Sequence, residues 1–366
     1  MSAHTHRHAP RAHSCLLRGC FFLVLCCLLL IAAGCGSGTA NSATSTPTPT
    51  PTPAVTAGPL SISAPSNNAT VTSPIQFSGS VGDTTGVDHT RLLLDGADSI
   101  FYGGILPLKN KWMFLPTGQH NLTFAGYDKS DKQIASSTIT LNVSGQTSPA
   151  VLSQLQNIPE WQWCTAQLNG SVCAAGLGNA TSVQTLHVPS PSLSGSSAQF
   201  SIGGTTGYSN SLWWLSLGGG TPLSKFTYAL DFYVDNADVA EALEFDVNQS
   251  FGGVRYTWGT ECSYKNTKMW DVWDPKGEKW IPSKVPCPPV TSKQWHHLSW
   301  QFEKVNNQVH YISVTLDGQT TPVDMFLDPQ PNWLQEDIDI AFQMDGDGAQ
   351  TPYNVWLDNV SLTASY

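Results

Sequence analysis

Two carboxylates stand two residues apart in a short strand-like run, residues 242–247. Successive side chains of a strand point to opposite faces, so Glu244 and Asp246 face the same way and can act as a pair. Gln249 follows, and its amide can bind but cannot supply a proton. Three interpretations stay open: an ordinary strand with exposed acids, a groove in which Glu244, Asp246 and Gln249 bind sugar hydroxyls, or an active site that uses a distant second acid.

Aromatic residues follow this run at high density. Twelve of the 13 tryptophans lie within residues 150–366. Sugar rings stack on aromatic rings, and their hydroxyls bond to amides and carboxylates, so this composition favours a carbohydrate ligand. Residues 269–287 are rich in Trp, Pro and Lys, and we expect a long loop over one end of a cleft or a loop with its own small core. The candidate ligand-binding residues are Gln249, Tyr256, Trp258, Trp270, Trp273 and Gln343.

Two further groups could attract a metal ion. His296 and His297 are adjacent, so on a regular strand they point to opposite faces and cannot share one ion; we expect a structural role. Asp345 and Asp347 stand among glycines, which suits a structural calcium loop. The segment lacks the third acid and the terminal Glu of an EF-hand, and a solvated turn is the alternative. No other cofactor is expected.

The cysteines divide into two groups. Five lie within the first 35 residues, and the other four are Cys164, Cys173, Cys262 and Cys287. An even set in an exported chain predicts two disulfides. Four cysteines allow three pairings, and proximity in sequence favours Cys164–Cys173 and Cys262–Cys287. A zinc site is the alternative, but no Cys-x-x-Cys pair occurs.

The composition excludes several classes of protein. Charged residues make up 12% of the 366 residues, and the formal net charge is −10. A globular chain carries about 25% charged residues, and helical bundles need long Glu/Lys/Leu-rich runs that this sequence lacks. No basic stripe exists to neutralise phosphates, so nucleic acid is not an expected partner. No nucleotide, dinucleotide or hydrolase-elbow fingerprint occurs.

The N-terminal region has the features of an export signal. Three arginines precede a short apolar run that ends near Ala33, and the run is too short for a comfortable membrane span. Residues 1–34 are therefore predicted to be a signal peptide. Residues 35–58 contain alternating Thr and Pro, which favours an extended, stiff spacer.

The end of the apolar run resembles the lipobox of bacterial lipoproteins. It reads Ile31, Ala32, Ala33, Gly34 and Cys35, with Ala32 in place of the preferred leucine. The resemblance implies that Cys35 is lipidated and that the protein is anchored at the bacterial cell envelope, on the outer membrane or cell surface. A plain secretory signal or a single membrane anchor is the alternative.

Two β regions follow the spacer. Residues 59–145 contain short alternating runs separated by turn residues, as in an all-β sandwich. The segments "LLLDG", "LPTGQHNLTFAGYD" and "STITLNVSG" resemble bacterial immunoglobulin-like modules. No ligand site is expected in this region, which we interpret as a spacer module.

Residues 150–366 carry recurrent strand-like runs without capped helices, which fits a two-sheet jelly roll. "WHHLSWQFEKVNNQVHYISVTLDG" and "YNVWLDNVSLTA" resemble the concanavalin A-like lectin and glucanase superfamily. The sequence therefore predicts an all-β chain, an immunoglobulin-like sandwich followed by a concanavalin A-like jelly-roll sandwich. A shared fold does not decide function.

The run of residues 244–249 resembles the E-x-D-x-x-E strand of retaining β-glucanases in glycoside hydrolase families 16 and 7. That resemblance implies that Glu244 is a nucleophile, Asp246 an assisting residue and Gln249 the acid/base, with a bulge that brings the last position onto the same face. Gln249 is a departure, because a retaining mechanism needs a carboxylic acid there.

These features together predict a cell-surface lipoprotein that binds a polysaccharide or oligosaccharide in the concave groove of its jelly roll. The alternative is a glycoside hydrolase or polysaccharide lyase that uses the same groove, with Glu244 and Asp246 on the catalytic strand. A structural adhesive module with a flat apolar patch is a third class.

Overall fold

The computed structural model describes residues 60–102, 108–165, 180–220, 222–333 and 336–366. The predicted signal peptide, the lipidation site at Cys35 and the spacer lie outside these residues. The described chain is built from strands and contains no α-helix, which confirms the all-β prediction. Its helical elements are two single 3₁₀ turns, η1 (Leu155–Asn157) and η3 (Ala237–Val239).

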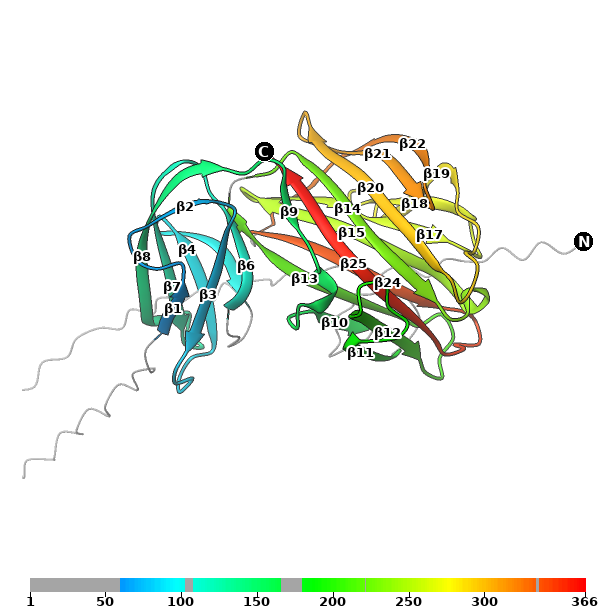
Figure 1. Ribbon diagram of the computed structural model, residues 1–366, viewed down its shortest axis with the longest axis horizontal. Helices are drawn as coiled ribbons and strands as arrows, with labels where there is room; N and C mark the ends of the chain where they lie inside the picture. The colour runs from blue at the N-terminus through cyan, green and yellow to red at the C-terminus, as the bar shows by residue number, and fades with distance from the viewer. Residues whose placement is uncertain (1–59, 103–107, 166–179, 221, 334–335) are drawn as a thin grey trace, which may run out of the picture.

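The largest sheet has twelve strands and crosses the whole molecule (Figure 1). Its strand order is β1 (Leu60–Ala64), β3 (Ile75–Val81), β6 (Leu108–Phe114), β13 (Asn210–Gly220), β24 (Asp337–Gly346), β15 (Ala240–Phe251), β17 (Thr260–Ser263), β18 (Met269–Asp274) and β19 (Lys279–Pro286). Three short strands are attached to this path: β10 (Gln162–Thr165), β16 (Val254–Trp258) and β23 (Gln330–Pro331).

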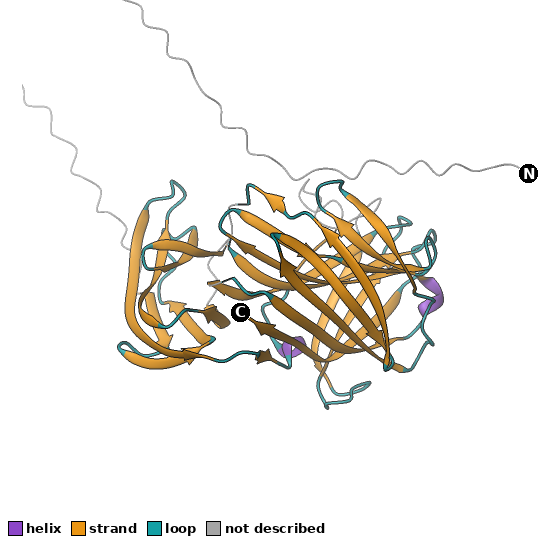
Figure 2. Cartoon of the chain, turned by 90° about the horizontal axis from the view of Figure 1, so that it is seen from above, coloured by secondary structure: helices purple, strands orange, loops and turns teal. Residues whose placement is uncertain are grey.

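Two smaller sheets cover this one (Figure 2). The eight-stranded sheet runs in the order β11 (Thr181–Val188), β12 (Ser197–Gly203), β25 (Tyr353–Ser365), β14 (Lys225–Val234), β20 (Trp295–Val305), β21 (Gln308–Leu316) and β22 (Gln319–Leu327), with β9 (Ala150–Leu152) paired to β25. The five-stranded sheet runs in the order β2 (Ala69–Ser73), β8 (Gln133–Gln146), β7 (Gly118–Tyr127), β4 (His89–Leu94) and β5 (Ala97–Tyr102).

Two hydrophobic cores lie between these layers. The smaller core contains Phe77 and Phe124 and belongs to the strands before residue 146. The larger core contains Trp213, Trp300 and Phe342 and is sandwiched between the eight-stranded sheet and the C-terminal half of the large sheet. On β14, for example, the core side chains come from every second residue, Phe226, Tyr228, Leu230 and Phe232, which follows from the alternation of side chains across a sheet.

The same alternation positions a second set of side chains. On β15 the residues Leu243, Phe245 and Val247 enter the core, so Glu244 and Asp246 point to the opposite face of the large sheet. The neighbouring strand β24 presents its polar residues on that same face, because Glu244 pairs with Gln343 and Asn248 pairs with Asp339. The outer face of the large sheet therefore carries the candidate site.

Candidate functional site

A groove of about 490 Å³ lies on the outer face of the large sheet. Its floor consists of polar residues from β15 and β24, and its sides are aromatic. The residues that line it are Leu212, Trp214, Glu244, Asp246, Asn248, Arg255, Thr257, Gly259, Trp273, Trp280, Gln330, Trp333, Asp337, Asp339, Ala341 and Gln343. Four carboxylates thus share the groove with a single guanidinium.

Side-chain hydrogen bonds fix the two ends of the floor. At one end the Gln343 amide donates both to Glu244 and to Asp345, the latter at 2.9 Å. At the other end Asn248 Nδ2 donates to Asp339 Oδ1 at 2.7 Å, and the Arg255 guanidinium reaches the other oxygen of Asp339 at 3.4 Å. These bonds hold the floor groups in place.

Burial changes the acidity of the floor. It raises the pKa of Asp246 to about 7, although Asp246 accepts a hydrogen bond from the Thr260 backbone N–H at 2.9 Å. Burial, with the neighbouring Asp339 carboxylate, raises the pKa of Asp337 to about 7. Burial also raises the pKa of Asp339, and Arg255 opposes that rise. Carboxyls that titrate near neutrality in a cleft are typical of functional sites.

The aromatic walls come from strands at the edge of the sheet and from the segment after β23. Trp273 on β18 and Trp280 on β19 are opposite each other, with ring centroids 5.3 Å apart. Gly259 makes room for them, since a Cβ at this position would lie 2.8 Å from the Cβ of Trp273. On another side the Arg255 guanidinium lies 4.6 Å from the ring centroid of Trp333.

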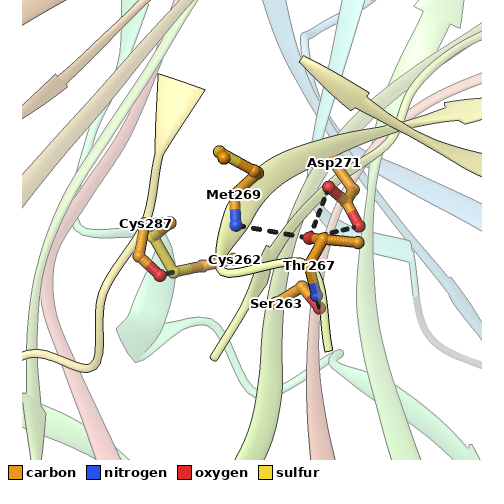
Figure 3. The surroundings of a disulfide bond; sticks show 6 residues. All are labelled: Cys262, Ser263, Thr267, Met269, Asp271 and Cys287. Carbon is orange, nitrogen blue, oxygen red and sulfur yellow. Dashed lines mark hydrogen bonds between the residues drawn. A yellow bond between two sulfur atoms is a disulfide. The ribbon is translucent and has the colours of Figure 1, made fainter. Parts of the chain in front are cut away.

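A disulfide stabilises the edge that carries these walls. Cys262 on β17 is bonded to Cys287, just after β19, with a Cα–Cα distance of 5.6 Å, which confirms one predicted bridge (Figure 3). Beside it Thr267 donates to both oxygens of Asp271, at 2.8 and 2.9 Å. Cys173 lies outside the described residues, so the Cys164–Cys173 bridge stays a prediction.

The expectation of a long loop over residues 269–287 was wrong. The structure forms the hairpin β18–β19 there, and the turn is closed by Asp274, whose Oδ1 accepts the backbone N–H groups of Lys276 and Gly277. Proline is tolerated because β19 is the last strand of the sheet path. The hairpin extends the sheet and places Trp273 and Trp280 at the side of the groove.

Three polar atoms at the groove have unused hydrogen-bonding capacity. In the described ranges no partner lies within hydrogen-bond distance of Asn248 Oδ1, an acceptor whose residue is 5% exposed. The buried indole N–H groups of Trp280 and Trp333 likewise have no acceptor in the described part of the chain. A buried polar group without a partner is costly, so a ligand that reached these atoms would be stabilised by hydrogen bonds to them.

The groove collects some of the residues proposed from the sequence. Glu244, Asp246, Trp273 and Gln343 all line it. Gln249 does not, because β15 runs from Ala242 to Ser250 without a bulge and Gln249 points away. Its amide instead donates to the Leu223 carbonyl at 3.0 Å and accepts the Leu223 N–H at 2.6 Å. Asn248 occupies the position on the groove face, and it is again an amide.

Three aromatic candidates belong to the core. Trp258 is fully buried and packs against Phe226, and Trp270 packs edge-on against Trp300. Tyr256 is buried beside Trp258, and its hydroxyl donates to Asn307 Oδ1 at 2.5 Å. These residues do not line the groove, so the structure assigns them to packing.

The two predicted metal-binding acids have different partners. Asp347 accepts the backbone N–H groups of Ala349 and Thr351 and closes the turn after β24. Asp345 instead lies beside Glu244 and Glu261, and carboxylate oxygens of these three buried residues lie within 4.8 Å of one another. Such a trio could hold a cation. The predicted pairing of Asp345 with Asp347 therefore does not describe the geometry, and calcium stays a prediction.

The histidine pair behaves as expected for a structural role. His296 is buried and bonds to Asp317 and to the Thr291 carbonyl, while His297 is exposed and bonds to Asp231.

Several groove residues were not proposed from the sequence. Asp337, Asp339 and Trp333 enter the site from segments distant from Glu244 in sequence, Trp214 comes from β13, and Arg255 comes from β16, the strand that follows β15. One signal was present: apart from Ala341, residues 337–345 alternate polar and apolar side chains, with three aspartates on one face. That pattern marks a strand with an acidic outer face, and only its pairing with β15 reveals that the face is shared.

No family model and no curated protein matches the chain. Similar solved structures include carbohydrate-binding modules of the β-sandwich superfamily, with 11% identity over 82% of this chain and 95% of that one, and a TM-score of 0.31. The module CBM66 from Bacillus subtilis has 13% identity over 55% of this chain and 94% of its own, with a TM-score of 0.28. Alginate lyase Aly36B has 13% identity over 59% and 97%, with a TM-score of 0.33. Similarities at this level do not assign a function.

Among the described residues, no helix has the length and apolar character needed to cross a membrane.

Proposed function

We propose that the protein binds a neutral oligosaccharide or polysaccharide in the groove on its large sheet. The observation that carries the proposal is the floor of hydrogen-bond acceptors beneath tryptophan walls. Asn248 Oδ1 has an unused acceptor position, and the indole N–H groups of Trp280 and Trp333 have unused donors. Sugars combine apolar ring faces with hydroxyls that both donate and accept, so they match both surfaces.

The charge of the groove favours neutral over uronate-containing glycans. Glu244, Asp246, Asp337 and Asp339 line it, against the single guanidinium of Arg255. Arg255 is already engaged by Asp339 and by the ring of Trp333. A carboxylate on the sugar would therefore meet like charges in a partly buried site, which is unfavourable.

Calorimetric titration of residues 36–366, which include every described residue, tests this proposal. The ligands are hexasaccharides of cellulose, β-1,3-glucan, xylan, mannan and alginate. We expect at least one neutral hexasaccharide to bind and the alginate hexasaccharide to bind at least about tenfold more weakly. Preferential binding of alginate, or the absence of binding to all four neutral ligands, would contradict the proposal.

Glycoside hydrolysis is the second candidate function. The observation that favours it is Asp246, a buried carboxyl with a pKa raised to about 7, on the same face as Glu244. A carboxyl that is protonated near neutral pH can serve as a general acid while another carboxylate acts as nucleophile or base. We rank binding first, since the groove position that follows Asp246 carries the amide of Asn248.

Reducing-end release separates these two functions. We expect no release from any panel member by the wild-type chain, and we expect Glu244→Gln to weaken binding by about 1–3 kcal/mol at most. If the wild type releases oligosaccharides and Glu244→Gln abolishes that release while keeping affinity, the enzyme becomes the better account.

We also propose that the protein is an exported lipoprotein of the bacterial cell envelope. The support is the lipobox-like sequence that ends in Cys35 and the Thr/Pro spacer that follows it. Mass analysis of the mature N-terminal peptide should find acylated Cys35, and an unmodified N-terminus at another residue would refute the anchor.

A further inference from the structure

The N-terminal strands are joined to the groove-bearing sheet by direct pairing. Strand β6 runs parallel to β13, with Trp112 opposite Gly218 and Phe114 opposite Gly220. Both glycines have positive φ values, +134° and +118°. A Cβ at Gly218 would lie 1.9 Å from the Trp112 carbonyl oxygen, and one at Gly220 would lie 2.3 Å from that of Phe114. Glycine at these positions allows the close approach of β6.

A buried lysine crosses this junction. Lys111 on β6 is 4% exposed, and its Nζ donates to the backbone carbonyl of Ser216 on β13 at 2.5 Å. The hydroxyl of the same Ser216 donates to Asp337 Oδ1 at 2.9 Å. Asp337 is 5% exposed and lines the groove. One continuous chain of contacts thus runs from the N-terminal strands to the groove floor.

Groups of opposite charge lie near one another at this junction. Burial lowers the pKa of the Lys111 ammonium, and the nearby carboxylates of Asp337 and Glu160 oppose that fall. Asp337 also lies near Asp339, whose like charge opposes its ionisation, and near Arg255, which favours it. A buried carboxylate needs a nearby cation or it takes up a proton. Lys111 is the cation that approaches Asp337 from the N-terminal strands.

We infer that Lys111 is a positioning residue for the groove, which makes the N-terminal strands part of the ligand site. Through Ser216 it holds Asp337 in place, and its charge keeps that carboxyl able to accept hydrogen bonds from sugar hydroxyls. Without Lys111, a larger fraction of Asp337 would be protonated at neutral pH and would present a donor where the floor presents acceptors. This inference rests on the proposed binding function for its affinity test, but the charge coupling itself can be measured without a ligand.

The test uses residues 36–366 with four changes: Lys111→Met, Lys111→Arg, Asp337→Asn and the double variant Lys111→Met/Asp337→Asn. Carbon-13 spectra of the aspartate carboxyls report the titration of Asp337 in each folded variant. We expect Lys111→Met to move its midpoint upward by about one pH unit or more and Lys111→Arg to leave it nearly unchanged. An unchanged midpoint in Lys111→Met would overturn the inference, whether or not any glycan binds.

Affinity provides the second measurement, with the tightest-binding neutral hexasaccharide of the panel. We expect Lys111→Met to weaken binding about tenfold at pH 7 and to shift its pH profile, while Lys111→Arg stays within about threefold. In the Asp337→Asn background, Lys111→Met should cause no further shift of the profile. An equal shift in that background would show that Lys111 acts only through folding, and the inference would fail.

The double variant covers the case in which Lys111→Met does not fold. If the lysine is needed to balance Asp337, the neutral Asn should restore the fold, because no uncompensated carboxylate remains at that position. A double variant that is as unstable as Lys111→Met would contradict the inferred coupling. Absence of any glycan binding with the carbon-13 shift present would instead reject the proposed function and keep the coupling.

Discussion

The acidic side chains on the two sheets of the larger sandwich have different kinds of partner. On the eight-stranded sheet two acids of the strands are paired with histidines, Asp231 with His297 and Glu303 with His310, both at 2.8 Å. On the groove face four carboxylates share one guanidinium beneath tryptophan walls. The first arrangement satisfies each acid within the chain, and the second leaves acceptors for a ligand. Burial beneath aromatic walls therefore distinguishes the candidate site from an ordinary charged surface.

The largest effect on the groove is expected from removing the disulfide that stabilises its wall. The double change Cys262→Ser and Cys287→Ser removes a disulfide between residues that are 25 positions apart in the sequence. We expect the free energy of unfolding in urea to fall by about 2–4 kcal/mol, with loss of glycan affinity because β19 carries Trp280. A loss below about 0.5 kcal/mol would show that the hairpin does not depend on the bridge.

The next effect is on affinity and compares one tryptophan from each sheet. Trp280→Ala removes a groove wall, and Trp356→Ala removes a ring that packs against Tyr233 on the eight-stranded sheet. We expect Trp280→Ala to weaken binding of a neutral hexasaccharide at least about tenfold and Trp356→Ala to leave it unchanged, as measured by calorimetry. Equal losses in the two variants would mean that binding does not occur in the groove.

A third effect sharpens the electrostatic side of the comparison. The pKa of Asp246 is raised from 3.8 to about 7, so the folded protein holds this proton more tightly than the unfolded chain. Its contribution to stability is present below about pH 4 and is lost as the pH rises through about 7. Between these values the free energy of unfolding of the wild type should fall by about 1.4 kcal/mol per pH unit more steeply than that of Asp246→Asn.

Urea unfolding at several pH values gives these slopes. Parallel stability curves for the wild type and Asp246→Asn would contradict a raised pKa for Asp246.

The smallest effect is expected on the eight-stranded sheet. Asp231→Asn removes the carboxylate that His297 contacts at 2.8 Å, and the side chain of His297 is 53% exposed. Exposed ion pairs contribute about 0–1 kcal/mol, so urea unfolding should detect little change and glycan affinity should stay the same. A loss of affinity in this variant would extend the site beyond the groove.

The sequence could place Glu244 and Asp246 of the candidate site on one face because alternation is a local property. Glu244 and Asp246 stand on one face of β15 whatever the rest of the fold does. Without the register of the strands, the same reasoning wrongly placed Tyr256 and Trp258 among the ligand-binding residues. On β16 these two face the core, and Arg255 and Thr257, which alternate with them, face the groove. An aromatic residue is equally suited to either face, so its type alone could not decide.

The pairing of strands that are far apart in sequence could not be predicted from local sequence patterns. Asp337 and Asp339 reach the groove because β24 lies between β13 and β15, although about 90 residues separate it from Glu244 in sequence. The N-terminal region was expected to be a spacer without a role in the site. The pairing of β6 with β13 brings Lys111 to the backbone carbonyl of Ser216, whose side chain bonds to Asp337 in the groove floor. No sequence pattern near Lys111 indicates that contact.

The most direct test of the groove as the ligand site uses four indole N–H groups that lack an acceptor among the described residues. Two belong to groove residues, Trp280 and Trp333, and two lie elsewhere, on Trp300 in the core and Trp356 on the eight-stranded sheet. Nitrogen-15 spectra of residues 36–366 are recorded during titration with each neutral hexasaccharide of the panel. The account predicts that the Trp280 and Trp333 signals move at saturation while those of Trp300 and Trp356 stay in place. Movement of the Trp356 signal alone, or binding by calorimetry with no change at Trp280 and Trp333, would contradict it.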